Sequence, residues 1–209
     1  MHLLLLLIAA TQASPVEPIR VPVTDECGSD ASFAEYRKHL VEAVSNKDVA
    51  ALQPLVAPGV MVSFGTGEDG WSAFLQEWGL DQPHASGLWT ELGQILGLGC
   101  GDYEGIKYMP MNFAEFGEED ASFPPYWAVQ EGAAFRGQPS GTAPVVMLLD
   151  HHLLYEIDNV APDGWLHARL SDGRAGYVER SAVRNAIDYR ATFELRDGKW
   201  LMTSFLAGD

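Results

Sequence analysis

Tyr155, Trp165 and Tyr177 are the side chains of this sequence that are best suited to ligand recognition. Residues 165–170 alternate polar and apolar side chains, which is typical of a strand with one buried face. Trp165 lies on the polar face of that strand with His167 and Arg169, and the apolar face consists of Leu166, Ala168 and Leu170. Because partly exposed aromatic rings favour recognition, we predict that the three rings line a shallow binding groove. The alternative is that they only close a small β-barrel.

Other patterns that could support chemistry lack the required spacing. His151 and His152 are adjacent, so along a strand their side chains point to opposite faces and cannot easily share one metal ion. Gly97, Gly99 and Gly101 follow a helical pattern and do not stand between a strand and a helix, so they do not form a dinucleotide loop. The sequence contains no nucleophile elbow and no recognisable Ser, His and Asp grouping. We therefore predict no catalytic residue, no metal site and no cofactor.

The first residues of the chain read as an export signal. An apolar run from Leu3 to Ala10 is followed by small residues, and Ala13 is placed for cleavage before Ser14. The run is shorter than the about 20 apolar residues that a membrane-spanning helix needs. We therefore predict a signal peptide over residues 1–13, no membrane insertion after its cleavage, and a periplasmic or secreted mature protein.

Cys27 and Cys100 are the two cysteines of the chain, and each precedes a glycine. An even number of cysteines in an oxidising compartment favours a disulfide, so we predict that the two are joined. Two free thiols are the alternative. A zinc site is disfavoured because the two cysteines lack the clustered ligand spacing that zinc requires.

The charge of the chain bears on its partners. The sequence has 13 Lys plus Arg against 29 Asp plus Glu, a formal net charge of -16. Nucleic acids and anionic lipids are polyanions whose binding depends on basic patches, and the sequence shows no such patch. We therefore predict no nucleic-acid partner. Acidity that keeps an exported protein in solution is the simpler interpretation.

Helical patterns precede the aromatic region. Ser32 to Glu35 reads as a capping box before a helix with one apolar face. A further helix over residues 49–56 is expected to be shortened or kinked by Pro54. The remaining expected elements before the aromatic region are a strand over residues 60–64 and amphipathic segments over residues 71–78 and 88–96.

The carboxyl end reads as a β-hairpin. Residues 189–195 alternate apolar and polar side chains, and Asp197-Gly198 turns the chain into residues 200–205. Two strands alone are marginally stable in water, so the apolar face of this hairpin needs a partner.

The segment from residue 135 to 178 carries the first family resemblance. Its short apolar runs are separated by turn sequences of tightly connected antiparallel strands. Their order resembles the bacterial Src-homology-3-like domain of exported proteins, through Arg136-Gly137-Gln138-Pro139-Ser140, Asp163-Gly164-Trp165 and Gly176-Tyr177-Val178. The resemblance implies a small β-barrel that in some relatives binds cell-wall material or a peptide. The chain departs from the family at Asp150-His151-His152, where a glycine is usual.

A second resemblance links the two ends of the chain. Asn46-Lys47-Asp48, the strand from Val60 to Phe64 and Asp197-Gly198-Lys199-Trp200 look like parts of a nuclear-transport-factor-two-like fold, a curved sheet wrapped on helices. This resemblance implies that the barrel is inserted into an α+β domain. The alternative is a helical domain followed by an enlarged barrel.

The predicted fold class is therefore α+β, with a small Src-homology-3-like β-barrel inserted in or appended to a helix-plus-curved-sheet domain. The predicted segments are a signal peptide (1–13), a linker (14–29), an α+β domain (30–122), the barrel (123–186) and a C-terminal hairpin returning to the α+β domain (187–209).

The leading functional prediction is an exported, non-catalytic binding or scaffolding protein whose barrel contacts a peptide or a cell-wall fragment. The rival is a small-molecule-binding protein or an enzyme that uses a cavity of the α+β domain. A buried carboxylate or histidine with a shifted pKa in such a cavity would favour the rival. Asp69 and Asp188 are available, but a helix cap and a turn at a strand edge account for them. The sequence predicts neither the ligand nor the oligomeric state.

Overall fold

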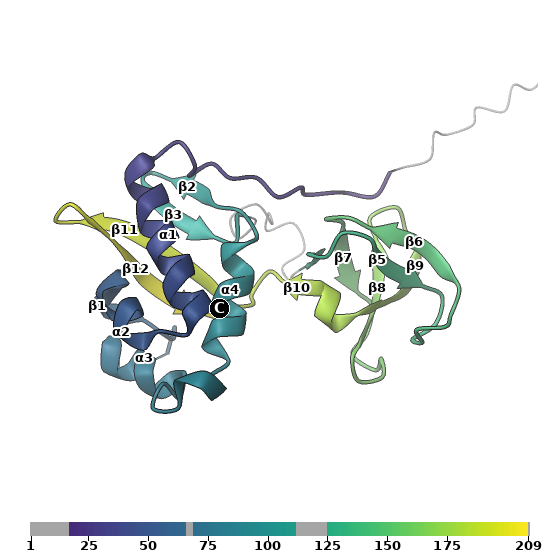
Figure 1. Ribbon diagram of the computed structural model, residues 1–209. Helices are drawn as coiled ribbons and strands as arrows, with labels where there is room; N and C mark the ends of the chain where they lie inside the picture. Colours follow the sequence, from purple (N-terminus) through teal and green to yellow (C-terminus); the bar gives the residue numbers. More distant parts are fainter. Residues whose placement is uncertain (1–16, 66–68, 112–124, 209) are drawn as a thin grey trace, which may run out of the picture.

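The chain forms an α+β structure with two sheets (Figure 1). The computed structural model describes residues 17–65, 69–111 and 125–208. A five-stranded sheet has the order β1-β12-β11-β3-β2, and a seven-stranded sheet has the order β10-β4-β7-β8-β9-β5-β6. The predicted signal peptide lies outside the described residues. Within the described ranges, no helix combines the length and the apolar character that crossing a membrane requires.

The five-stranded sheet and the helices packed on it form the α+β unit, residues 26–111 and 187–208. Its segments come from both sides of the seven-stranded sheet in the sequence. They are α1 (Ala31–Asn46), α2 (Val49–Leu52), η1 (Gln53–Leu55), β1 (Val56–Met61), α3 (Trp71–Glu77), η2 (Pro83–Ala85), α4 (Leu88–Leu96), β2 (Gly101–Tyr103), β3 (Ile106–Met109), β11 (Arg190–Arg196) and β12 (Lys199–Leu206).

Helix α1 is capped by Asp30, which corrects the capping box expected at Ser32. The Asp30 carboxylate accepts hydrogen bonds from the backbone N–H groups of Ser32 and Phe33, which have no partner within the helix. The Ser32 hydroxyl donates to the same carboxylate and accepts from Trp200 Nε1 at 2.9 Å. Ser32 therefore ties the start of α1 to the C-terminal hairpin.

The C-terminal hairpin belongs to the five-stranded sheet. β12 pairs with β1, and β11 pairs with β3. Asp197 and Gly198 both have positive φ, which is the backbone of a two-residue type I′ turn. The apolar face of the hairpin packs on α1, where the Phe33 ring lies 5.6 Å from Phe193 and 4.9 Å from Trp200, measured between ring centroids.

The first strand of this sheet differs from its predicted position. β1 spans Val56–Met61, whereas the sequence pattern placed a strand at residues 60–64. Pro58 lies inside β1, and this is tolerated because β1 stands at the edge of the sheet. β1 runs parallel to β12. Pro54 ends α2 as expected, and a 3-10 turn replaces the rest of the predicted helix.

The seven-stranded unit, residues 125–186, is antiparallel throughout its strand pairs. β10 and β6 stand at the two ends of the strand order, so the pairing describes an open sheet. Its core consists of apolar side chains that include Phe135, Leu154, Leu166 and Val178. The elements are β4 (Tyr126–Ala128), β5 (Ala133–Arg136), β6 (Val145–Leu149), β7 (Leu153–Glu156), β8 (Trp165–Leu170), β9 (Ala175–Glu179), η5 (Arg180–Ala182) and β10 (Val183–Asn185).

An N-terminal strap, residues 17–25, runs from the seven-stranded unit to the α+β unit (Figure 1). Trp127 Nε1 donates to the Val21 carbonyl at 2.9 Å, and the Trp127 ring packs with Leu98 and Leu153. Arg184 adds a polar contact between the units, because its Nη1 donates to Gln94 Oε1 at 2.8 Å. The strap and these contacts hold the two units against each other.

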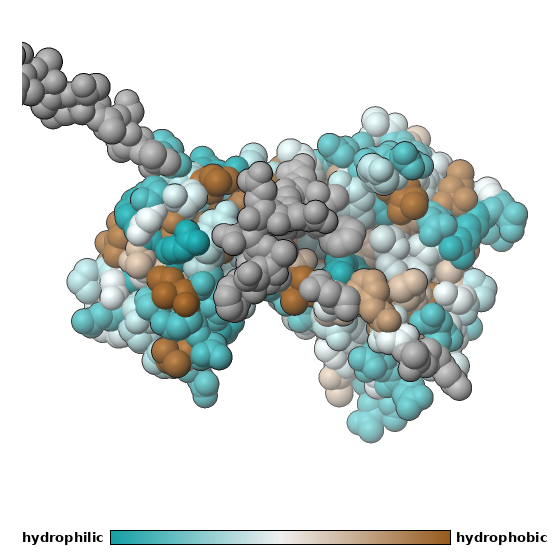
Figure 2. All heavy atoms as spheres, turned by 180° about the vertical axis from the view of Figure 1, so that it is seen from behind, coloured by the Kyte–Doolittle hydropathy of each residue, from teal (hydrophilic) through white to brown (hydrophobic). Residues whose placement is uncertain are grey.

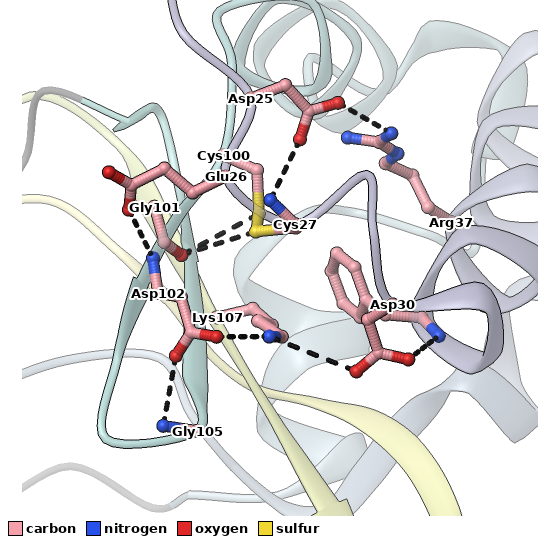
Figure 3. Close-up of a disulfide and its surroundings, with 11 residues drawn as sticks. Asp25, Glu26, Cys27, Asp30, Arg37, Cys100, Gly101, Asp102, Gly105 and Lys107 are labelled. Atoms are coloured by element: carbon pink, nitrogen blue, oxygen red, sulfur yellow. Dashed lines mark hydrogen bonds and ion pairs between the residues drawn. A yellow bond between two sulfur atoms is a disulfide. The ribbon is translucent and has the colours of Figure 1, made fainter.

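A disulfide joins Cys27 to Cys100, with 5.7 Å between their Cα atoms, and confirms the predicted pair (Figure 3). Both residues are fully buried. Beside them, the buried Lys107 ammonium donates to Asp102 and lies 3.9 Å from Asp30 Oδ2. The hydrogen bond from Lys107 lowers the pKa of Asp102, and hydrogen bonds from Ser32 and Phe33, with the charge of Lys107, lower the pKa of Asp30.

We expect the disulfide to contribute substantially to stability. The bond joins residues separated by 73 positions, for which the chain-entropy model gives about 4 kcal/mol. Replacing both cysteines by serine should lower the free energy of unfolding by about that amount, measured by urea denaturation without reductant. The free energy of unfolding of the wild-type protein in reductant should approach that of the double variant. An unchanged midpoint in the double variant would contradict the estimate.

The interactions of Lys107 with Asp102 and Asp30 make the free energy of unfolding depend on pH. The pKa of Asp102 and of Asp30 is lowered in the folded state, so their contribution is present above about pH 4 and is lost as the pH falls through the folded pKa values. Lys107→Met should therefore flatten the decline of unfolding free energy between about pH 4 and about pH 2. Lys38→Met, at an exposed lysine, is the control. Parallel profiles for wild type and Lys107→Met would refute the assignment.

Candidate functional site

The outward face of β7, β8 and β9, here called the aromatic face, carries the three predicted binding residues. Tyr155 stands opposite Arg169, and Tyr177 stands opposite His167, in the strand pairing. Trp165 occupies the same face of β8, two residues from His167. The three rings are partly exposed. The structure therefore brings Tyr155, Trp165 and Tyr177 to one face of the sheet, and their role in binding stays a prediction.

Two of these rings are paired with basic side chains. The Arg169 guanidinium lies 5.0 Å from the centroid of the Tyr155 ring. The His167 imidazole stacks on Tyr177 with 4.5 Å between centroids and an interplanar angle of 11°. Trp165 stacks on no other ring among the described residues, so the face consists of two fixed pairs and one separate indole.

Asp158 completes this face, and sequence reasoning missed it. Its Oδ2 lies 2.8 Å from His167 Nδ1, and this hydrogen bond lowers the pKa of Asp158. Arg136 of β5, also missed, pairs in register with Tyr177. The sequence placed Arg136 in the Src-homology-3-like motif but assigned neither residue to the site, because the cross-strand register decides which side chains meet.

A second candidate is a groove on the five-stranded sheet, here called the sheet groove. It has a volume of about 330 Å³ and lies on the sheet face opposite α1. Figure 2, which views the molecule from behind Figure 1, shows pale and brown side chains among teal ones on this side of the α+β unit. Its lining residues are Gly59, Met61, Phe64, Asp69, Arg190, Thr192, Glu194, Arg196, Thr203, Ser204 and Leu206.

The floor of the sheet groove follows from strand register. Met61, Ser204 and Thr192 are successive cross-strand partners on β1, β12 and β11. The Thr192 hydroxyl lies 2.6 Å from that of Ser204 and 3.0 Å from that of Thr203. Thr203 occupies the irregularity where the β11–β12 register shifts, so its hydroxyl joins the same cluster.

A buried cation borders the hydroxyl cluster. Arg190 is only 7% exposed, and its Nη2 donates to the Gly208 carbonyl at 2.6 Å. The guanidinium lies 5.3 Å from the centroid of the Phe64 ring, which is 53% exposed. Backbone carbonyls and an aromatic ring thus hold the charge at the edge of the groove.

The carboxylates of the groove are engaged by protein groups. Glu194 Oε2 accepts from Arg196 at 3.1 Å, and Asp69 Oδ1 accepts weakly from the Val62 N–H at 3.4 Å. The N-cap of α3 is Gly70, which corrects the cap expected at Asp69. Asp188 accepts from the Asn185 N–H in the turn before β11 and lies outside the groove lining.

The sheet groove does not lie between the sheet and the helices. The sheet–helix interface is packed by large apolar side chains, among them Phe33, Leu40, Phe74, Phe193 and Phe205, each fully buried. The polar side chains that alternate with them along the same strands point to the opposite face of the sheet and line the groove.

Asp25, Cys27 and Cys100 also lie close enough together to resemble a metal site. Both sulfur atoms belong to the disulfide, however, so neither is a thiolate ligand.

Comparison with known proteins gave two matches. No protein-family model and no curated protein matches the chain. A candidate ketosteroid isomerase from Shewanella frigidimarina NCIMB 400 is 9% identical, with TM-score 0.34, over 87% of this chain and 98% of that one. A chain named Rd1NTF2_05, carrying five substitutions, is 12% identical, with TM-score 0.29, over 86% and 99%. At these values the likeness decides neither fold nor function, and the Src-homology-3-like assignment stays a prediction.

The exposure of Trp165 gives a test of its place on the aromatic face. Trp165→Ala should cost much less free energy of unfolding than the about 3–5 kcal/mol typical of a buried tryptophan. Trp127, which is fully buried, is the matched control, and Trp127→Ala should reach that range. Urea denaturation of both variants measures the difference. Equal losses would place the Trp165 indole in the core.

Proposed function

We propose that the α+β unit binds a small molecule in the sheet groove. The observation that supports this most is the groove itself, because about 330 Å³ lies within the range of small-ligand sites. It combines a cluster of hydroxyl groups with apolar side chains, which is the mixed lining that such sites use.

The lining indicates the chemistry of the ligand. Met61, Phe64 and Leu206 offer apolar contact, and Thr192 and Ser204 offer hydroxyl groups. A ligand with an apolar body and hydrogen-bonding oxygen groups fits this combination. We propose binding without catalysis, since the carboxylates of Asp69 and Glu194 already accept hydrogen bonds from protein groups.

Filling the groove tests this proposal. A Cβ added at Gly59 meets no atom within 4 Å, and its φ lies outside the positive range, so Gly59→Phe should fold and place its ring in the groove. The fluorescent probe 8-anilinonaphthalene-1-sulfonate, which has an aromatic body and an anionic group, should bind the parent protein. Gly59→Phe should weaken that binding at least about tenfold, which corresponds to 1.4 kcal/mol.

Gly141→Phe is the matched control, because Gly141 is equally unobstructed and lies in the seven-stranded unit. It should leave the affinity unchanged. Equal probe affinity in parent and Gly59→Phe protein, or loss of binding in both variants, would contradict a ligand site in the groove.

The aromatic face supports a second candidate function. We propose that it belongs to a Src-homology-3-like module of an exported protein and recognises a peptide or a cell-wall fragment. Arg169 lies over the Tyr155 ring on this face, and Arg136 pairs in register with Tyr177, in a chain of net charge -16. Carboxylate groups of a peptide or wall fragment complement such cations, and its sugar or peptide planes complement the rings. The disulfide fits an oxidising, periplasmic or secreted location.

Co-sedimentation with isolated cell-wall fragments tests the second candidate. Trp165→Ala and Arg169→Met should each lower the fraction of protein that sediments, while thermal denaturation shows that both remain folded. Arg174→Met, at an exposed arginine paired with Asp172 in the β8–β9 turn, should sediment like the parent. Equal sedimentation of all four proteins would remove the aromatic face from wall recognition.

A further inference from the structure

Two turns of the seven-stranded unit bring one imidazole and two carboxylates together. Glu131 lies in the turn between β4 and β5, and Asp150 and His151 lie in the turn between β6 and β7. One potential ligand atom from each of the three side chains lies within 4.8 Å of the other two. The three residues form neither of the candidate binding surfaces described above.

His151 is largely buried, and its Nε2 is the ring nitrogen that faces Asp150. Its side chain is 14% exposed, and its Nδ1 is buried with no hydrogen-bond partner. Its Nε2 lies 3.6 Å from Asp150 Oδ1, which is longer than a hydrogen bond but suited to two ligands of one ion. The backbone of His151 has φ +53°, a conformation that L residues rarely adopt, and its ring packs on Trp127 with 5.5 Å between centroids.

Asp150 divides its two oxygen atoms between different tasks. Oδ2 pairs with the Arg20 guanidinium of the strap, and Arg20 Nε donates to the Asp150 carbonyl at 2.9 Å. Oδ1 is thereby directed towards His151. Such an outer hydrogen bond is how metal-binding carboxylates are held in orientation. His152 lies apart from this arrangement, because its Nδ1 accepts from the Asp150 N–H at 2.9 Å.

We propose that Glu131, Asp150 and His151 form a binding site for a divalent transition-metal ion, with zinc as the ion that fits best. One imidazole nitrogen and two carboxylate oxygens are ligands that zinc accepts, and water would complete the coordination. The imidazole disfavours calcium and magnesium, which prefer oxygen ligands only. The sequence did not predict this site. The adjacency of His151 and His152 argued against a shared metal ion, and Glu131 lies far from both in the chain.

The site also bears on the strap. The Val21 N–H donates to the His151 carbonyl at 2.8 Å, and the Leu153 N–H donates to the Ile19 carbonyl at 3.0 Å. A bound ion would fix the turn on which the strap docks. Metal binding is therefore expected to reduce backbone exchange in residues 19–21 as well as at the site.

Calorimetric titration of the disulfide-bonded protein with zinc chloride tests the proposal. The parent protein should bind one ion, and His151→Asn and Glu131→Gln should each weaken the affinity at least about tenfold. Asparagine is chosen because it tolerates the left-handed backbone of residue 151. Glu131→Gln changes an exposed side chain, so it keeps the test valid if His151→Asn folds poorly.

His84→Gln, at a histidine of η2 in the α+β unit, is the control and should bind zinc like the parent. X-ray absorption of the zinc-loaded protein should show nitrogen and oxygen ligands and no sulfur. Failure of the parent protein to bind zinc, or equal affinities in the parent, His151→Asn and Glu131→Gln proteins, would overturn the site. A loss in His84→Gln as large as in His151→Asn would do the same.

Discussion

The packing of the β11–β12 hairpin against α1 is the interaction on which the α+β unit depends. Phe193 of β11 and Met202 of β12 face the helix. The residues that alternate with them along the strands, such as Thr192, face the opposite way. Because side chains alternate along a strand, burying one set commits the other to the sheet groove. A slip of one residue would expose Phe193 and bury Thr192. The same apolar contacts therefore determine both the core and the polar surface that we propose as the ligand site.

The insertion of the seven-stranded unit follows from the geometry of β3 and β11. β3 ends at Met109 and β11 begins at Arg190, and Met109 is the cross-strand partner of Ala191. The two ends of the inserted segment thus emerge at neighbouring positions of one sheet. A domain whose termini lie close together can be inserted at such a point without disturbing the pairing on either side.

Local patterns allowed several elements to be predicted from the sequence. Asp197-Gly198 indicated the hairpin because this dipeptide adopts the positive φ angles of a tight turn, and the stripe from Phe33 to Val44 indicated α1. The cap was predicted two residues too late, since the Asp30 carboxylate accepts from the backbone N–H groups of Ser32 and Phe33 and the helix begins at Ala31. β1 was misplaced because Pro58 argues against a strand unless the strand is known to be at an edge.

The candidate sites were less predictable because they depend on residues far apart in the sequence. Part of the aromatic face could be predicted from the sequence, since Trp165, His167 and Arg169 alternate within one strand. The sheet groove required the register of β1 with β12, which joins the two ends of the chain. Glu131 and His151 meet only through two turns whose geometry the sequence does not specify. The barrel closure and the segment boundaries predicted from the sequence stay predictions.

The disulfide has a topological consequence for the covalent structure. The chain between Cys27 and Cys100 includes α1, α2, β1, α3 and α4, so these elements form a closed covalent ring. Hydrolysis of one peptide bond within this ring opens it without releasing a fragment. Hydrolysis of one bond between Cys100 and the hairpin, in contrast, separates the chain into two pieces, which then remain attached only through non-covalent contacts, those of β11 and β12 among them.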